Sequence, residues 1–333
     1  MFSRPRTRLW AAGLSLASLC ALLLAACGGS GTGSGPAQGT PITGGAKATT
    51  VVDCSNSDAT TSGLHLVTPH ELTIGSDTTY APAEFVDPNN PTIDDGYDMD
   101  LARELARRLC LGPNIVTASF PSIITDIAGP ALGQQPWDLS ISSFTINSTR
   151  QAKVDMIPYF IAGESTLVQK GNPKHVTDIS SMCGLTVSAQ NGTVELFELQ
   201  DANGTGASQN DGGVTQPPVC KTNPIKILSY DSEEDVIAQV ISGRADAAYQ
   251  DQPVTDYYIS LHQGQLDPGY ITTGSSGTEG IVVRKDNPAL ETALKNALNA
   301  MVQDGTYQRL MAAWGQTKLA CLAATGGCPP SQG

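Results

Sequence analysis

The stretch DMDLARELARRLCLGPNIVT, residues 98–117, sets the pattern on which the whole chain is built. Residues 98–111 predict an amphipathic helix, because leucines recur on one face while the arginines lie mostly off it. Residues 115–117 predict a strand after the helix, and residues 72–75, LTIG, predict a strand before it. This strand, helix, strand order indicates an α/β fold with a largely parallel sheet. The leucines that share the helical face are Leu101, Leu105 and Leu109.

The same alternation continues outward from this stretch and then restarts. A Gly-, Asn-, Asp- and Pro-rich segment predicts a surface loop at residues 201–219. The two similar half-patterns indicate two α/β lobes, and no short internal repeat is visible. The other predicted elements are a helix at 123–131, strands at 138–142 and 185–188, a helix from Thr193, a strand at 225–228, a helix at 232–242, strands at 245–249 and 280–283, and helices within 288–315.

The N-terminus has the layout of an export signal. Three arginines precede an apolar run, residues 9–26, which is short for a membrane span. The run ends in LAAC, residues 24–27, which resembles the lipobox of bacterial lipoproteins. We therefore expect a lipoprotein signal peptide at 1–26 and lipidation of Cys27. The alternatives are an ordinary signal peptide with an incidental cysteine, or a permanent membrane anchor.

A tether is expected directly after the proposed lipid site. Residues 27–52 are rich in Gly, Ser and Thr, a composition typical of flexible linkers. No second long apolar run follows. The sequence therefore predicts a folded domain held near the outer face of the cell membrane by its lipid.

Composition limits the possible functions of that domain. Roughly 280 residues remain after the leader and tether, which suits a two-lobed protein or two modest domains. Hydrophobic residues make up 40% of the chain, enough for sizeable cores. The formal net charge of −13 argues against binding nucleic acid.

Eight cysteines are present, with Cys20 in the leader and Cys27 at the proposed lipid site. An even number of remaining cysteines in an exported protein favours disulfides, and six allow 15 pairings. A metal site is the rival, but no two of the six form a C-x-x-C pair and the four histidines are scattered. No metal or cofactor is expected. The six are Cys54, Cys110, Cys183, Cys220, Cys321 and Cys328.

Short motifs in the folded region, taken together, resemble the polar amino-acid family of periplasmic solute-binding proteins that serve ABC importers. The resemblance covers residues 71–315 and rests on the order and spacing of the motifs. These are IGSDTTYAP at 74–82, GYDMDL at 96–101, DLSISSFT at 138–145 followed by Arg150, QNGT at 190–193, GRADA at 243–247, QD at 250–251 and DGTY at 304–307.

The resemblance implies a two-lobed periplasmic-binding-protein fold of type II, with mixed sheets flanked by helices and a ligand cleft between the lobes. Lobe one would span 65–160 and 278–321, lobe two 163–273, and the tail 322–333, with hinges near 159–162 and 273–278. It also favours the pairs Cys183–Cys220, Cys321–Cys328 and Cys54–Cys110. An alternative ties Cys54 to the C-terminal tail.

The resemblance also assigns the ends of an α-amino acid ligand. Arg150 would take the carboxylate in a two-pronged pair, assisted by backbone N–H groups of Gly192 and Thr193 at a helix start. Thr193 could equally be a helix cap, and the two roles are compatible. Asp251 would hold the ammonium, with Thr145 and the carbonyl of Ser143 sharing the ammonium or the carboxylate.

The side chain of the ligand would lie between the rings of Tyr80 and Phe120, although Phe120 could instead belong to the core. Asp77 would read its far end. Because no base other than Arg150 occurs in the matched motifs that form the pocket, a cationic or amide side chain is favoured over an acidic one. Val194 and Ala83 stand where many relatives carry polar or aromatic residues.

The expected function is capture of a free polar α-amino acid by cleft closure and delivery to the permease and ATPase of an ABC importer. The protein is expected to work as a monomer. A sensor that signals to a membrane partner is the main rival. A dehydratase on the same fold is another, but no Ser-His-Asp order, metal spacing or phosphate loop is evident.

Overall fold

The computed structural model describes Cys54, Thr61 and residues 63–205, 217–272 and 277–317. The predicted signal peptide at 1–26, the tether at 27–52 with Cys27, the tail at 322–333 and the pair Cys321–Cys328 lie outside these residues, as does most of the predicted loop at 201–219. Within the described part, no helix combines the length and the apolar character that crossing a membrane requires.

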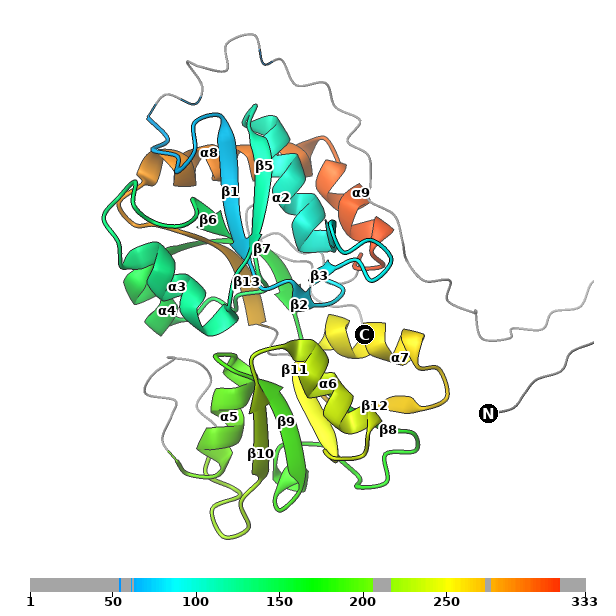
Figure 1. The fold of residues 1–333 in the computed structure, drawn as a ribbon. Coiled ribbons are helices and arrows are strands. Elements are labelled where there is room, and N and C mark those ends of the chain that lie inside the picture. Colours follow the sequence, from blue (N-terminus) through cyan, green and yellow to red (C-terminus); the bar gives the residue numbers. More distant parts are fainter. Residues whose placement is uncertain (1–53, 55–60, 62, 206–216, 273–276, 318–333) are drawn as a thin grey trace, which may run out of the picture. The chain divides into compact units, whose positions relative to one another are not determined.

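Two five-stranded mixed sheets form the framework (Figure 1). We call the first lobe the sheet ordered β5-β1-β6-β13-β7 with its helices, and the second lobe the sheet ordered β10-β9-β11-β8-β12 with its helices. The first sheet contains β1 (Glu71–Ser76), β5 (Gly112–Thr117), β6 (Leu139–Ser140), β7 (Asp155–Ala162) and β13 (Gly277–Val283). The second contains β8 (Glu164–Gln169), β9 (Thr186–Gln190), β10 (Lys226–Tyr230), β11 (Ala247–Asp251) and β12 (Leu266–Ile271).

The direction of each strand depends on how the chain enters its lobe. β1 pairs in parallel with β5 and β6, and β9 pairs in parallel with β10 and β11. β13 and β8 each begin just after the chain crosses from the other lobe, and they run antiparallel to their neighbours. The predicted parallel pairing is thus confirmed for the βαβ units, while the crossing strands make both sheets mixed.

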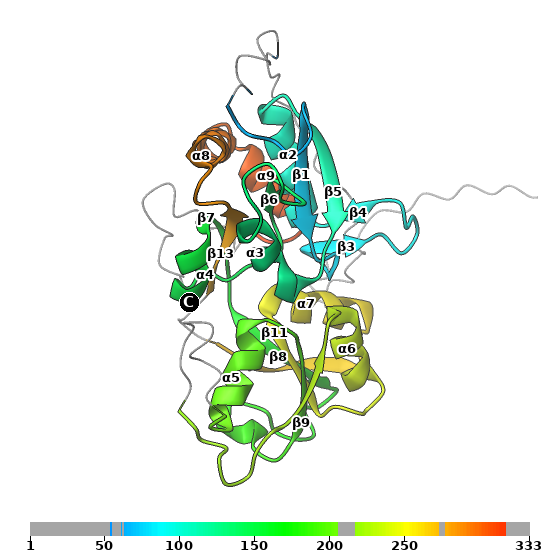
Figure 2. The same cartoon turned by 60° about the vertical axis from the view of Figure 1, so that its left-hand side comes forward.

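Alternating burial explains the layers of the first lobe. On β13, Ile281 and Val283 join one hydrophobic cluster and Val282 joins another, because successive side chains of a strand point to opposite faces. The first cluster includes α2 (Tyr97–Arg108), α8 (Pro288–Gln303) and α9 (Thr306–Ala313); the second includes α3 (Phe120–Ala128). The sheet is therefore covered on both faces, as Figure 2 also shows. The short helix α4 (Ser148–Lys153) packs beside α3 and β7.

The second lobe follows the same rule. Ala247 and Tyr249 of β11 pack with α5 (Val194–Ala202), whereas Ala248 packs with α6 (Glu233–Ile241) and α7 (Gln252–Leu261). A single turn of 3-10 helix, Ser180–Met182, lies on the α5 side. A small third sheet orders β2 (Thr79–Tyr80), β3 (Glu84–Val86) and β4 (Asp94–Asp95).

Local backbone geometry explains where the predicted bounds fail. The helix predicted at 98–111 ends at Arg108, since Cys110 adopts φ 59°. The strand predicted at 138–142 is shorter in the structure and spans only Leu139–Ser140. The backbone turns away at Ser143, where φ is 46°. The helix predicted at 123–131 starts earlier, at Phe120, with Pro121 in the first turn where its missing N–H costs nothing.

Several elements are absent from the sequence prediction, namely α4, α7, β7, β8, β12 and the small sheet. The strands β7, β8 and β12 form long-range pairs, and their stability comes from neighbours far away in the sequence. Local periodicity carries little information about such strands.

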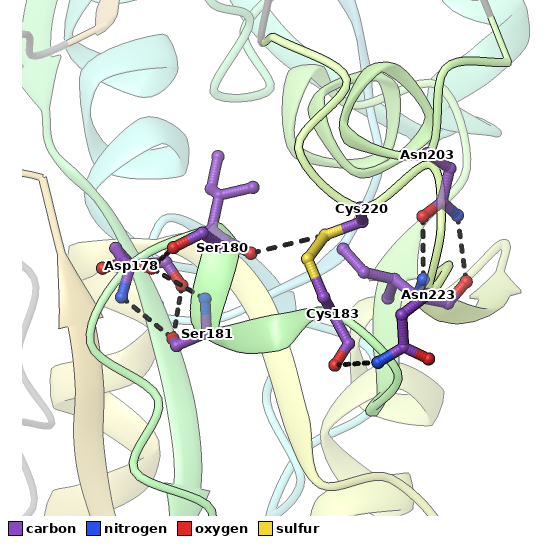
Figure 3. The surroundings of a disulfide bond; sticks show 9 residues. Asp178, Ser180, Ser181, Cys183, Asn203, Cys220 and Asn223 are labelled. Carbon is purple, nitrogen blue, oxygen red and sulfur yellow. Dashed lines mark hydrogen bonds between the residues drawn. A yellow bond between two sulfur atoms is a disulfide. The ribbon is translucent and has the colours of Figure 1, made fainter.

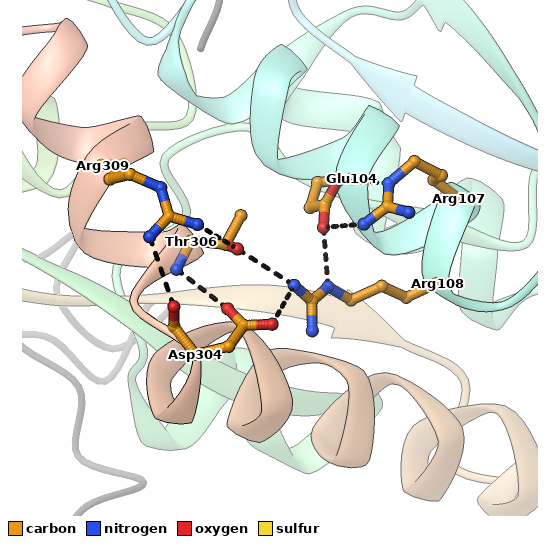
Figure 4. Close-up of polar contacts among 6 residues, drawn as sticks. All are labelled: Glu104, Arg107, Arg108, Asp304, Thr306 and Arg309. Atoms are coloured by element: carbon orange, nitrogen blue, oxygen red, sulfur yellow. Dashed lines mark hydrogen bonds and ion pairs between the residues drawn. The ribbon is translucent and has the colours of Figure 1, made fainter. Parts of the chain in front are cut away.

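Ionic contacts join the first and last helices of the first lobe (Figure 4). Arg108 of α2 donates to Glu104 at 2.7 Å and to Asp304, just after α8, at 2.7 Å. Burial would raise the pKa of Glu104, but hydrogen bonds from Arg107 and Arg108 lower it below its ordinary value. Because several charges share these contacts, the network holds the C-terminal helices better than an isolated surface pair would.

Two disulfides are formed among the described residues. Cys54 pairs with Cys110, which rules out the alternative link from Cys54 to the tail, and Cys183 pairs with Cys220. Figure 3 shows the second bond beside the turn at Asp178, where Ser181 and Asp178 exchange hydrogen bonds. These two of the three predicted pairings are confirmed. The second bond closes the loop that carries β9 and α5, two elements of the candidate site.

Removing the second disulfide should destabilise the protein. The two cysteines are 37 positions apart, so the double variant Cys183→Ala, Cys220→Ala should lose about 3–4 kcal/mol of unfolding free energy through greater freedom of the unfolded chain. Urea denaturation followed by circular dichroism measures this loss. Dithiothreitol breaks both described disulfides. It should therefore lower the urea midpoint of the wild-type protein more than the double substitution does. An unchanged midpoint in the double variant would contradict the assigned role.

Candidate functional site

Polar side chains gather where strands of both lobes end. Asp77 follows β1, Ser142 follows β6, and Gln190 and Asp251 are the last residues of β9 and β11. In α/β proteins, ligands bind at the carboxyl ends of parallel strands. A pocket lies here, lined by Tyr80, Phe120, Ser142, Ser143, Thr145, Arg150, Gln190, Thr193, Val194, Glu195 and Asp251.

Direct hydrogen bonds connect the two lobes around this pocket. The hydroxyl of Tyr80 donates to Oδ2 of Asp251 at 2.9 Å, and Nε2 of Gln190 donates to Oδ2 of Asp77 at 2.6 Å. The backbone N–H of Glu233, at the start of α6, donates to Oγ1 of Thr79 at 3.2 Å. The pocket is therefore a cleft whose walls come from both lobes.

Arg150 is fixed in the cleft by the short helix α4. The Asn147 side chain caps this helix by accepting the N–H of Arg150 at 2.9 Å. The guanidinium donates to the carbonyl of Thr145 at 2.8 Å and to the carbonyl of Gly192 at 3.0 Å. A guanidinium has five N–H donors in a fixed fork, a geometry that matches a planar carboxylate.

Aromatic rings pack beside the guanidinium. The rings of Phe120 and Phe144 stack with their centroids 4.2 Å apart, and the central carbon of Arg150 lies 5.7 Å and 5.2 Å from them. Phe120 also belongs to the core cluster on the α3 side of the sheet. Phe120 was predicted either to flank the ligand or to belong to the core. It does belong to a core cluster, and it also lines the pocket.

The start of α5 faces Arg150 across the cleft. Gly192 has φ 82°, and a Cβ there would approach Cα of Pro121 to 3.0 Å, so a larger residue would be both strained and crowded. Thr193 is the N-cap of α5 and accepts the N–H of Leu196 at 3.3 Å. The predicted cap is confirmed. The N-terminus of α5, which carries the positive end of the helix dipole, lies at the pocket.

Asp251 and Asp77 are buried acids with altered ionisation. Burial raises the pKa of Asp251 to about 6, although the Tyr80 hydroxyl and the charge of Arg150 act to lower it. Burial likewise raises the pKa of Asp77 to about 6, against hydrogen bonds from Thr79, Phe120 and Gln190 that lower it. A nearby cation would stabilise the ionised form of both.

Two buried acids, Glu84 and Asp98, hold the backbone turn at Ser142 and Ser143 in place. Ser142 accepts the N–H of Asp77 at 3.0 Å and donates to Glu84 at 3.0 Å. The backbone N–H of Ser143 donates to Asp98 at 3.1 Å. Burial raises the pKa of Asp98 to about 7, despite hydrogen bonds from Tyr159 and Ser143. This support holds Ser143 in the left-handed region of backbone space, which a non-glycine residue rarely occupies.

Most of the predicted ligand residues share the cleft, with two differences. Asp77 does not line the pocket itself but is hydrogen-bonded to Gln190, which does. Gly192 lines a neighbouring hollow with Phe120 and Arg150. The others meet in one pocket: Tyr80, Phe120, Ser143, Thr145, Arg150, Thr193 and Asp251.

Sequence reasoning missed three residues that line the pocket. Gln190 and Ser142 lie inside motifs that were recognised, so their positions at strand ends could have indicated them. Glu195 carries no such signal, because a glutamate in the first turn of a helix is ordinary. Among the described residues, no group of three or more His, Cys, Asp or Glu side chains has the geometry to hold a metal ion.

Comparison with known proteins places this geometry in a family. Residues 72–317 match the bacterial extracellular solute-binding proteins, family 3. Two Escherichia coli K12 relatives are similar: ABC transporter arginine-binding protein 1 is 29% identical, with 73% of this chain and 90% of the relative covered. The lysine/arginine/ornithine-binding periplasmic protein is 28% identical, with 76% and 90% covered.

A solved structure supports the same assignment. An ancestral arginine-binding protein bound to arginine is 26% identical, has a TM-score of 0.63, and is matched over 74% of this chain and 98% of its own. Since the family match covers nearly the whole described region, the chain belongs to the family 3 bacterial extracellular solute-binding proteins.

Proposed function

We propose that this protein captures a cationic α-amino acid between its lobes and delivers it to an ABC importer. The observation that carries the proposal is the charge of the cleft: Arg150 is the one base among the described residues that line it, beside the acids Asp251 and Glu195. Asp77 adds a further acid behind Gln190. The names of the relatives, which refer to arginine, lysine and ornithine, support the same class of ligand.

The α-carboxylate and the α-ammonium of an amino acid each find a charged partner in the cleft. The guanidinium of Arg150 suits the carboxylate, with the start of α5 adding a favourable dipole. Asp251 suits the ammonium. Tyr80, whose hydroxyl now bonds Asp251, and Phe120 would flank the aliphatic part of the side chain.

The balance of charge favours a cationic over an amide side chain. A zwitterionic amide such as glutamine brings no net charge to a cleft with more acids than bases. A buried carboxylate without a cationic partner is costly, so Asp77 would be better compensated by a guanidinium or ammonium group. This step goes beyond the sequence, which left the two classes open.

Closure would exchange contacts between the lobes for contacts to ligand. Tyr80, Asp251, Gln190 and Asp77 already bridge the lobes through hydrogen bonds. A ligand that offers charged partners to both sides would strengthen the closed arrangement. Bending near 159–162 and 273–278 remains our proposal for the hinges, and the second of these segments lies mostly outside the described residues.

The cellular location of the protein is also part of the proposal. Lipidation of Cys27 and the tether at 27–52 would keep a monomeric domain at the outer face of the cell membrane, close to a permease with its ATPase. Signalling to another membrane partner would use the same capture step, and loss of amino-acid uptake on gene deletion distinguishes import from sensing.

Calorimetric titration with the twenty amino acids, ornithine and citrulline tests the proposed ligand class. Arginine, lysine or ornithine should bind most tightly, since each carries a side-chain cation. Glutamine and citrulline should bind more weakly, and glutamate weakest of the polar set. Tightest binding of glutamate or aspartate, or no binding of any cationic amino acid, would refute the proposal.

Replacing Arg150 tests the orientation of the ligand. Arg150→Ala would leave the buried carboxylate unpaired, at a cost on the order of 3–5 kcal/mol, or roughly a hundredfold or more in affinity. Lys153→Ala is the matched control, because Lys153 ends the same helix and is exposed. Near-normal arginine binding by Arg150→Ala, measured by calorimetry, would remove Arg150 from the site.

The affinity for arginine should fall as the pH drops from 8 to 5. Asp77 and Asp251 each have a pKa near 6, and a cation binds their ionised forms, so protons compete with the ligand below that pH. Below pH 7 the ligand keeps both positive charges, so its own titration does not weaken binding there. Titrations at several pH values should show this slope, and Asp77→Asn should make it shallower while weakening arginine more than glutamine. A flat profile would contradict the assignment.

A further inference from the structure

Glu195 lines the cleft but has no role in the assignment given above. It is the second residue of α5 and only 2% exposed. Its Oε1 is buried and accepts no hydrogen bond from any described residue. A buried carboxylate oxygen is normally hydrogen-bonded, so this exception calls for a partner.

The beginning of α5 satisfies the Glu195 carboxylate only in part, because its own backbone N–H bonds to the carboxylate while Oε1 is left without a partner among the described residues. Thr193 already caps the helix through its side chain, which accepts the N–H of Leu196. The helix dipole favours an acid in the first turn by about 0.3–1 kcal/mol, which is less than the cost of burying a charged oxygen without a partner. The first turn of α5 therefore does not account for the buried Oε1 of Glu195.

The charged residues around Glu195 are mostly acidic. Asp251 at the end of β11 is its strongest charged neighbour, followed by Glu164 of β8 and Glu198 of α5. Tyr80, from the first lobe, lies near both Glu195 and Asp251. Burial, with repulsion from these acids, raises the pKa of the Glu195 carboxyl well above its ordinary value. A cation in the cleft would relieve both effects.

We infer that Glu195 is a second carboxylate for the α-ammonium of the ligand, acting beside Asp251. The inference rests on the proposed function and deepens it. An ammonium has three N–H donors, and Asp251 with Glu195, both from the second lobe, would accept two of them. The site would then require a free α-ammonium as strictly as it requires a carboxylate.

Glu233 offers a control that distinguishes direct contact with the ligand from a change in the electrostatic potential of the cleft. Like Glu195, it is fully buried, and neither of its carboxylate oxygens has a partner among the described residues. It interacts electrostatically with Asp251 and Asp77, yet it is not among the residues that line the cleft. Its removal changes the potential in the cleft without removing a contact there.

The test compares arginine with 5-guanidinopentanoic acid, which lacks only the α-ammonium, as ligands of the full chain. Glu195→Gln should weaken arginine about tenfold or more, the loss expected for a charged hydrogen bond, and weaken the analogue less than about twofold. Glu233→Gln should shift both ligands by similar small factors. Glu234→Gln, which removes an exposed charge from α6, should change neither.

Glu195→Asp is the control for a folding defect in Glu195→Gln. It keeps the carboxylate and should recover part of the arginine affinity that Glu195→Gln loses. Unchanged arginine binding by Glu195→Gln, or equal losses for arginine and the analogue, would overturn the inference while the proposed function stands. Failure of the wild-type protein to bind arginine, lysine and ornithine would instead overturn the proposed function, and the inference with it.

Discussion

The burial of carboxylates between the lobes is the constraint on which the rest of this structure depends. Asp251, Glu195 and Glu233 come from the second lobe and Asp77 from the first, and all four are at least nine-tenths buried. Burial raises the pKa of each of them above its ordinary value, so each carboxylate resists ionisation in the folded protein. A ligand cation reverses this resistance, which couples capture to the closure of the cleft.

The fold delivers these acids by a simple geometric rule. Strands that run toward the cleft end there, so the residue at or just after each end enters the site: Asp77 after β1, Gln190 on β9 and Asp251 on β11. Strands that have just crossed from the other lobe run the opposite way and place their first residues at the cleft. Glu164, the first residue of β8, accepts the Tyr249 hydroxyl at 2.8 Å and belongs to the same acidic surroundings.

Sequence reasoning predicted the parts that local patterns encode. Leucine spacing indicated α2, short apolar runs indicated β1 and β9, and the family resemblance indicated Arg150 and Asp251. It missed β7, β8 and β12, whose partners are distant in sequence. It also missed Glu195, because a glutamate at a helix start looks the same whether it faces solvent or a cleft. Only the three-dimensional arrangement shows that this carboxylate is buried beside Asp251.

The most direct test of the central claim is a crystal structure of the protein with bound arginine. Our account predicts the α-carboxylate at hydrogen-bonding distance from Arg150, the α-ammonium between Asp251 and Glu195, and the guanidinium directed toward Asp77. Arginine bound in the opposite orientation, or outside hydrogen-bonding reach of these acids, would contradict it.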